Sequence, residues 1–134
     1  MGDTMSRSNE ALDYFGQKIA SAVRDEAMDI MMNTLSGVDK SVPGRLYARR
    51  LAALSEEARK LVEELCLEAI DNTIHHLLWW IEQEQLNEEQ HVRVDVIIDG
   101  EVVDNIAKES DGLAGEYEGK EGWMGRFSKY PVRK

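Results

Sequence analysis

The spacing of hydrophobic residues changes near residue 90, and this change predicts the architecture of the chain. Before residue 90, hydrophobic residues recur every three or four positions, as they do on one face of an α-helix. After it, a run that starts at Val92 leads into Asp99-Gly100 and then into Val102-Val103. Apolar runs on both sides of an Asp-Gly pair are typical of a β-hairpin with a two-residue type I′ turn. The pattern predicts an α+β fold, in which a helical part precedes a small sheet.

Three helices are expected, over about residues 9–36, 42–54 and 55–87. The first is predicted to end at Gly37, because glycine tolerates the left-handed conformation that closes helices. Pro43 suits the first turn of the second helix. The third helix is the longest, and its stretch 74–81 is apolar almost all round. A helix of that kind is predicted to be central and covered on both sides, with Leu77 and Trp80 in the core.

The hairpin is expected over about residues 92–104, with Ile97 on the side away from the core. The segment 107–134 follows, and five glycines fall between residues 112 and 125, interleaved with aromatic residues. That density of glycine disfavours a stable helix, so we expect an ordered but irregular tail, with a third short strand left open. The length of 134 residues predicts a single domain, 1–134.

The net charge of −10 is unevenly distributed. Residues 120–134 hold five basic residues and one acidic residue, so the other 119 residues carry −14. An acidic body disfavours nucleic acid and anionic membranes as partners and favours a basic protein. The one cysteine, Cys66, lies in an apolar helical run, so we expect it to be a small buried hydrophobe. A single cysteine also excludes an intramolecular disulfide. The chain also shows no secretory signal pattern, so we expect a cytoplasmic protein without a membrane partner.

Two pairs of carboxylates recur at helical spacing, Glu26 with Asp29 and Glu68 with Asp71. Four carboxylates from two antiparallel helices can hold Mg²⁺ against a pyrophosphate. The pairs resemble the E-x-x-E and E-x-x-D motifs of the all-α NTP pyrophosphohydrolases, although Asp29 replaces a glutamate and the gap between the pairs is longer. The resemblance implies a Mg²⁺-dependent nucleotide pyrophosphohydrolase that uses these four ligands. His75, one turn after Asp71, offers a second metal interpretation, although a structural histidine is the more common outcome.

The preferred hypothesis is a protein that binds another protein and has no enzymatic activity or cofactor, as immunity proteins and antitoxins do against basic toxins. The chain contains no complete phosphate loop and no Gly-x-Ser-x-Gly nucleophile motif. Aromatic residues dominate interfaces, so the tail residues Tyr117, Trp123 and Phe127 are the predicted contacts, unless they close the core instead. A two-fold homodimer is also expected, through the part-apolar surfaces at Ile97 and at Met28 with Met32.

Overall fold

The computed structural model describes residues 3–132 and confirms the α+β fold. The elements in chain order are α1 (Asp3–Lys18), the π-helical segment η1 (Ile19–Asp25), α2 (Glu26–Leu35), α3 (Val42–Ala52), α4 (Glu56–Glu84), β1 (Val96–Ile98), β2 (Glu101–Val103), the 3₁₀ turn η2 (Ile106–Glu109), α5 (Leu113–Tyr117) and α6 (Trp123–Phe127). None of these helices is long and apolar enough to cross a membrane.

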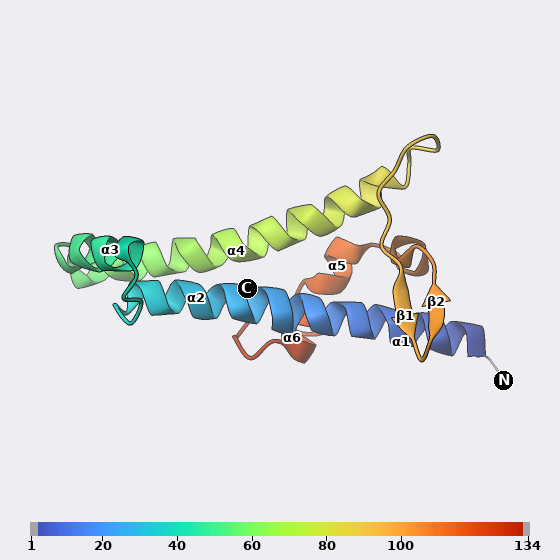
Figure 1. Cartoon of the computed structure of the whole chain (residues 1–134), viewed down its shortest axis with the longest axis horizontal. Helices are drawn as coiled ribbons and strands as arrows, with labels where there is room; N and C mark the ends of the chain where they lie inside the picture. The colour runs from blue at the N-terminus through green and yellow to red at the C-terminus, as the bar shows by residue number, and fades with distance from the viewer. Residues whose placement is uncertain (1–2, 133–134) are drawn as a thin grey trace.

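The first predicted helix is one continuous rod made of α1, η1 and α2 (Figure 1). It ends where the sequence predicts, and Gly37 has φ +81°. The π-helical segment was not predicted. A π-turn holds more residues than an α-turn, so the buried side of the rod shifts along the sequence. Val23 and Ile30 continue the helical spacing of apolar residues from the first part of the rod, yet both are exposed, and Arg24 and Met28 are buried instead.

The second and third predicted helices are confirmed as α3 and α4. The hydroxyls of Ser41 and Ser55 cap them by accepting hydrogen bonds from the backbone N–H groups of Gly44 and Ala58, each at 3.1 Å. With 29 residues, α4 is an unbroken helix about 43 Å long. It runs back beside α2 and then diverges from α1, so that the two long helices form a V (Figure 1).

The prediction that α4 is buried on all sides near residues 74–81 is wrong. Its buried positions share one side of the helix, and they are Leu67, Asp71, Ile74, Leu78 and Ile81. Leu77 is 48% exposed and Trp80 is 41% exposed. Successive residues point about 100° apart, so the elements that cover Leu78 and Ile81 leave Leu77 and Trp80 in solvent.

The hairpin is shorter than predicted, with three residues in each strand. Asp99 and Gly100 have φ of 51° and 83°, and positive φ at both positions is what a type I′ turn requires. The cross-strand pair Val96 and Val103 is buried, whereas the neighbouring pair Ile97 and Val102 is exposed, which confirms that Ile97 faces away from the core. Within residues 3–132 no third strand joins the sheet.

The C-terminal segment is more helical than its glycine content suggested, since α5 and α6 are five-residue helices. Two of its glycines allow a close backbone turn. A Cβ at Gly125 would lie 2.0 Å from the carbonyl oxygen of Lys120, and one at Gly122 would lie 2.1 Å from that of Glu118. The segment packs on α4 through α5 and on α1 and η1 through α6, and so fills part of the opening of the V (Figure 1).

Candidate functional site

The tail aromatics predicted to contact a partner lie in or against the core. Tyr117 is 0% exposed and Trp123 is 1% exposed, while Phe127 is half-buried against the same cluster. The Trp123 ring meets Phe15 edge-on, with the ring centroids 5.6 Å apart, and passes over Gly16, where a Cβ would lie 2.3 Å from the indole nitrogen. In this structure Tyr117 and Trp123 close the core and present no surface to a partner, which corrects the expectation from the sequence.

A buried arginine joins the two long helices to the tail. Arg24, in η1, is 0% exposed, and its Nε and Nη2 donate to the two carboxylate oxygens of Asp71 in α4 at 2.8 and 3.2 Å. Nη1 donates to the Ser128 hydroxyl at 2.7 Å and to the Tyr130 carbonyl at 2.9 Å. Nη2 also donates to the Pro131 carbonyl at 2.9 Å. All five N–H donors of the guanidinium therefore have acceptors.

The protonation states of this network are set by burial and hydrogen bonding. Burial lowers the pKa of Arg24, but the hydrogen bond to Asp71 and its negative charge outweigh that effect, and the pKa ends above its usual value. The Tyr117 hydroxyl donates to Asp71 at 2.6 Å. Burial, followed by this hydrogen bond, raises the pKa of Tyr117, so the phenol stays neutral. The network is thus a charged pair with a neutral donor, which suits a structural role.

Two carboxylates of the rod formed by α1, η1 and α2 also bind the C-terminal tail. Asp25 accepts hydrogen bonds from the Ser128 hydroxyl and the Lys129 backbone N–H. Asp29 accepts from the Lys129 ammonium at 2.8 Å and from the Tyr130 hydroxyl at 2.5 Å. The bonds from Lys129 and then Tyr130 lower the pKa of Asp29. Residues 128–131 are therefore bound along η1 and α2.

The four carboxylates of the magnesium hypothesis do not form one group. Asp71 is bonded to Arg24 and Tyr117, and Asp29 is bonded to Lys129 and Tyr130. Among the residues that the structure describes, no three His, Cys, Asp or Glu side chains gather as a metal site would require. His75 pairs with Glu118 at 2.8 Å from Nδ1, and not with Asp71. The arrangement gives the magnesium hypothesis no geometric support, and metal binding stays an untested prediction.

A small acidic cavity lies where α4 meets the C-terminal segment. Its volume is about 190 Å³, and three carboxylates line it, those of Glu68, Asp71 and Glu118. Small-molecule sites usually measure roughly 300–1,000 Å³, so this cavity suits one side chain better than a nucleotide. Leu65 and Trp79 are 60% and 44% exposed, and helical spacing places both on the same side of α4 as Glu68.

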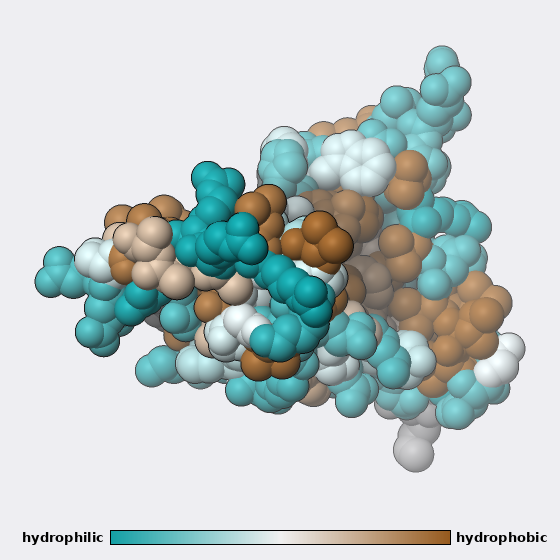
Figure 2. Space-filling view, turned by 60° about the vertical axis from the view of Figure 1, so that its left-hand side comes forward, coloured by the Kyte–Doolittle hydropathy of each residue, from teal (hydrophilic) through white to brown (hydrophobic). Residues whose placement is uncertain are grey.

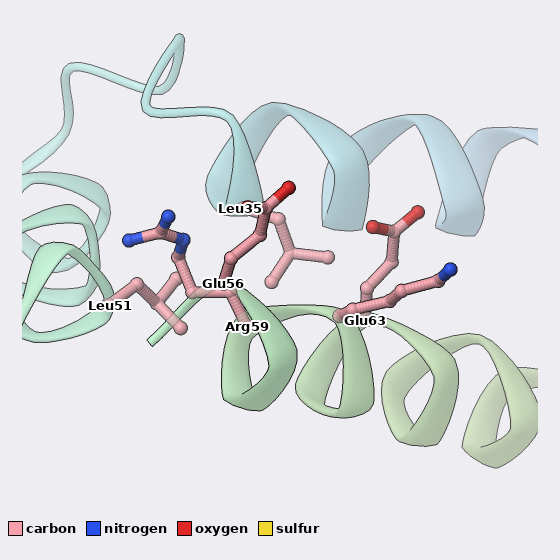
Figure 3. A pocket seen from close by; sticks show the side chains of 6 residues that line it. Leu35, Leu51, Glu56, Arg59 and Glu63 are labelled. Carbon is pink, nitrogen blue, oxygen red and sulfur yellow. The ribbon is translucent and has the colours of Figure 1, made fainter. Parts of the chain in front are cut away.

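A second concave region lies at the other end of the molecule, where α2, α3 and α4 meet. A cleft of about 430 Å³ has Leu35 and Leu51 among its walls and charged side chains from the start of α4 around them. Figure 3 shows the carboxylates of Glu56 and Glu63 directed from α4 toward α2, with Arg59 on the α3 side. Charges of both signs therefore mix at its mouth, and the cleft selects no particular ionic ligand.

Comparison of the chain with models of protein families, with curated proteins and with solved structures finds no match.

Sequence reasoning missed Arg24, although the sequence carries a signal for it. Ala20, Arg24 and Met28 step by four along the rod, and all three are buried. An arginine between two apolar residues at helical spacing indicates a buried cation that needs a carboxylate from elsewhere in the chain. Nothing in the spacing identifies that carboxylate as Asp71 rather than another of the 26 acidic residues.

Proposed function

We propose that this protein acts without enzymatic activity, by binding a basic protein partner, in the manner of an immunity protein or antitoxin. The partner-binding surface is the side of α4 that carries Leu65, Trp79 and the acidic cavity around Glu68. The observation that carries the proposal is that exposed apolar side chains lie on the same side of α4 as a cavity lined by three carboxylates.

The chemistry of this surface fits one lysine or arginine of a partner. A cation inserted into the cavity would face Glu68 and Glu118. Leu65 and Trp79 are about 21 Å apart along α4, so they would contact the partner on either side of the inserted cation. The net charge of −10 would draw a basic partner toward the molecule and raise the association rate. The expected signature is an association rate that falls steeply as salt is added.

The experiment is in-cell cross-linking of the tagged chain, followed by purification of the captured protein and calorimetric titration at low and high salt. Combined Leu65→Ala and Trp79→Ala substitutions should weaken binding by at least about tenfold, as loss of an interface anchor does. Tyr14→Ala, on the exposed side of α1, is the matched control and should bind like the wild type.

Catalytic turnover of a substrate by the purified chain would contradict this proposal. Mg²⁺-dependent hydrolysis of a nucleoside triphosphate that Glu68→Gln abolishes would favour the pyrophosphohydrolase alternative. A captured partner whose affinity is the same for the wild type and the Leu65/Trp79 variant would place the binding surface elsewhere.

A further inference from the structure

The layer formed by α2 and α4 has two different faces. The C-terminal segment covers one of them. On α4, His75 pairs with Glu118, and Glu82 accepts a hydrogen bond from the backbone N–H of Ala114. On α2, Asp29 binds Lys129.

The opposite face of the layer is apolar and open, and we name it the open face. Helical spacing places Cys66, Thr73, Leu77 and Trp80 on the side of α4 that points away from His75. At one end this face is a groove of about 430 Å³ walled by α2, α3 and α4. The groove shares Leu35 and Leu51 with the charged cleft described above but is a separate cavity. Its lining is mainly apolar and includes Met31, Leu35, Tyr47, Leu51, Val62 and Cys66. Beyond α3 the same face carries the exposed Leu77 and Trp80. Figure 2 shows hydrophobic side chains reaching the surface in several patches between hydrophilic ones.

The accessible surface of the chain is larger than a compact monomer of this mass would have. The accessible surface is 8970 Å², and the scaling for monomeric proteins gives about 7,100 Å² at 15.2 kDa. The excess is roughly 1,900 Å², whereas a stable interface of standard size takes roughly 800 Å² from each partner. The excess is sufficient for one full interface on each chain.

The charges of the segments at the two ends of α4 favour a second copy in antiparallel orientation. Residues 42–60 hold five basic and two acidic residues, a formal charge of +3, and residues 83–90 hold three acidic residues and no basic one, a formal charge of −3. Arg59 and Glu84 lie 25 residues apart, which is about seven turns, so both share the open side of α4. A two-fold axis between them would bring each basic end against the acidic end of the other copy.

We propose that the open face binds a second copy of this chain, with the two α4 helices antiparallel and the two-fold axis near residues 71–72. This register sets Leu77 of one copy opposite Cys66 of the other, and Trp80 opposite Val62, so that each indole enters the apolar groove of the second copy. The contact differs from the dimer surfaces that the sequence suggested, since Met28 is buried and Ile97 lies on the hairpin. It also leaves Leu65 and Trp79 free, so it does not depend on the proposed partner.

Light scattering of the purified chain tests the association. The expected mass is twice 15.2 kDa at micromolar concentration. Trp80→Glu should raise the dimer dissociation constant at least about tenfold, because it places a charge in an apolar contact. The control, Tyr14→Glu, adds the same charge to an exposed aromatic position on α1 and should remain dimeric. A wild-type mass near 15.2 kDa, a larger assembly, or a dimer that Trp80→Glu leaves intact would overturn the proposal.

Cross-linking through the native cysteine tests the register. Leu77→Cys should form a disulfide with Cys66 of the second copy when diamide oxidises the two thiols, and a band of twice the chain mass should appear without reductant. Asn72→Cys, on the side of α4 that faces the C-terminal segment, should give no such band. Failure of the Leu77 variant to cross-link while circular dichroism shows that it is folded and light scattering shows a dimer would exclude the antiparallel register.

Discussion

Replacing Arg24 by methionine should destabilise the protein more than any surface substitution. The change keeps much of the side-chain volume but leaves Asp71 buried, with Tyr117 as its remaining hydrogen-bond donor among the described residues. It also removes the bonds to Ser128, Tyr130 and Pro131. Breaking a buried ion pair by removing one partner costs about 3–5 kcal/mol. The unfolding entropy of a chain of 134 residues is about 0.28 kcal/mol/K, so the Tm should fall by roughly 10–18 °C.

The assay is urea unfolding of Arg24→Met followed by circular dichroism, together with tryptic cleavage after Lys129, which should accelerate because the tail has lost its anchor. Arg49→Met, on the exposed side of α3, is the control and should lie within about 0.5 kcal/mol of the wild type. A triple variant, Arg24→Met with Asp71→Leu and Tyr117→Phe, should regain at least about 2 kcal/mol, since no buried charge is then left alone. A loss below about 1 kcal/mol for Arg24→Met would refute the assignment of this network as the anchor of the tail.

Leu78→Ala should cost about 3–5 kcal/mol in urea unfolding, because Leu78 is fully buried, whereas the exposed Leu65→Ala should cost less than about 0.5 kcal/mol. Gly125→Ala should lower the Tm, with a loss of about 1–3 kcal/mol, because its Cβ would meet a backbone carbonyl; Gly115→Ala, in open space within α5, should be neutral or slightly stabilising. The pKa of Asp29 is lowered in the folded state, so its contribution to stability is present above pH 4 or so and disappears as the pH falls further. Asp29→Asn should therefore reduce the loss of stability between pH 6 and pH 2.5, and an unchanged acid profile would contradict the bonds to the tail.

Local sequence patterns predicted the elements that depend on local chemistry. Ser41 and Ser55 cap helices, and Asp99-Gly100 forms the type I′ turn, because these residues act on their own backbone within three positions. The side of α4 that is buried could not be read from residues 74–81, because every side there is apolar and distant elements decide which one is covered. Arg24 was missed for the same reason, since its acceptors lie 47 to 107 residues away.

For the candidate site too, the sequence predicted what depends on neighbouring residues and not what depends on distant ones. The sequence identified Glu68 and Asp71 as neighbours on one helix, and both line the acidic cavity. The sequence could not show that Arg24 forms an ion pair with Asp71, or that the side chains of Tyr117 and Trp123 are buried. Both features depend on how the glycine-rich C-terminal segment packs against the rest of the protein. The low helix propensity of its glycines gave no indication of α5 and α6.

The anchoring of the tail by Arg24 also has a consequence for synthesis of the chain on the ribosome. Arg24 is made more than one hundred residues before Ser128, Tyr130 and Pro131. At translation rates of about 5–20 residues per second, the arginine waits roughly 5–20 seconds for these acceptors. During that interval the rod and α4 can form as helices, but the guanidinium remains hydrated and the two helices cannot bury it between them. We therefore expect the nascent chain to stay loosely packed until residues 128–131 emerge, and to be a client for chaperones that bind exposed apolar helices.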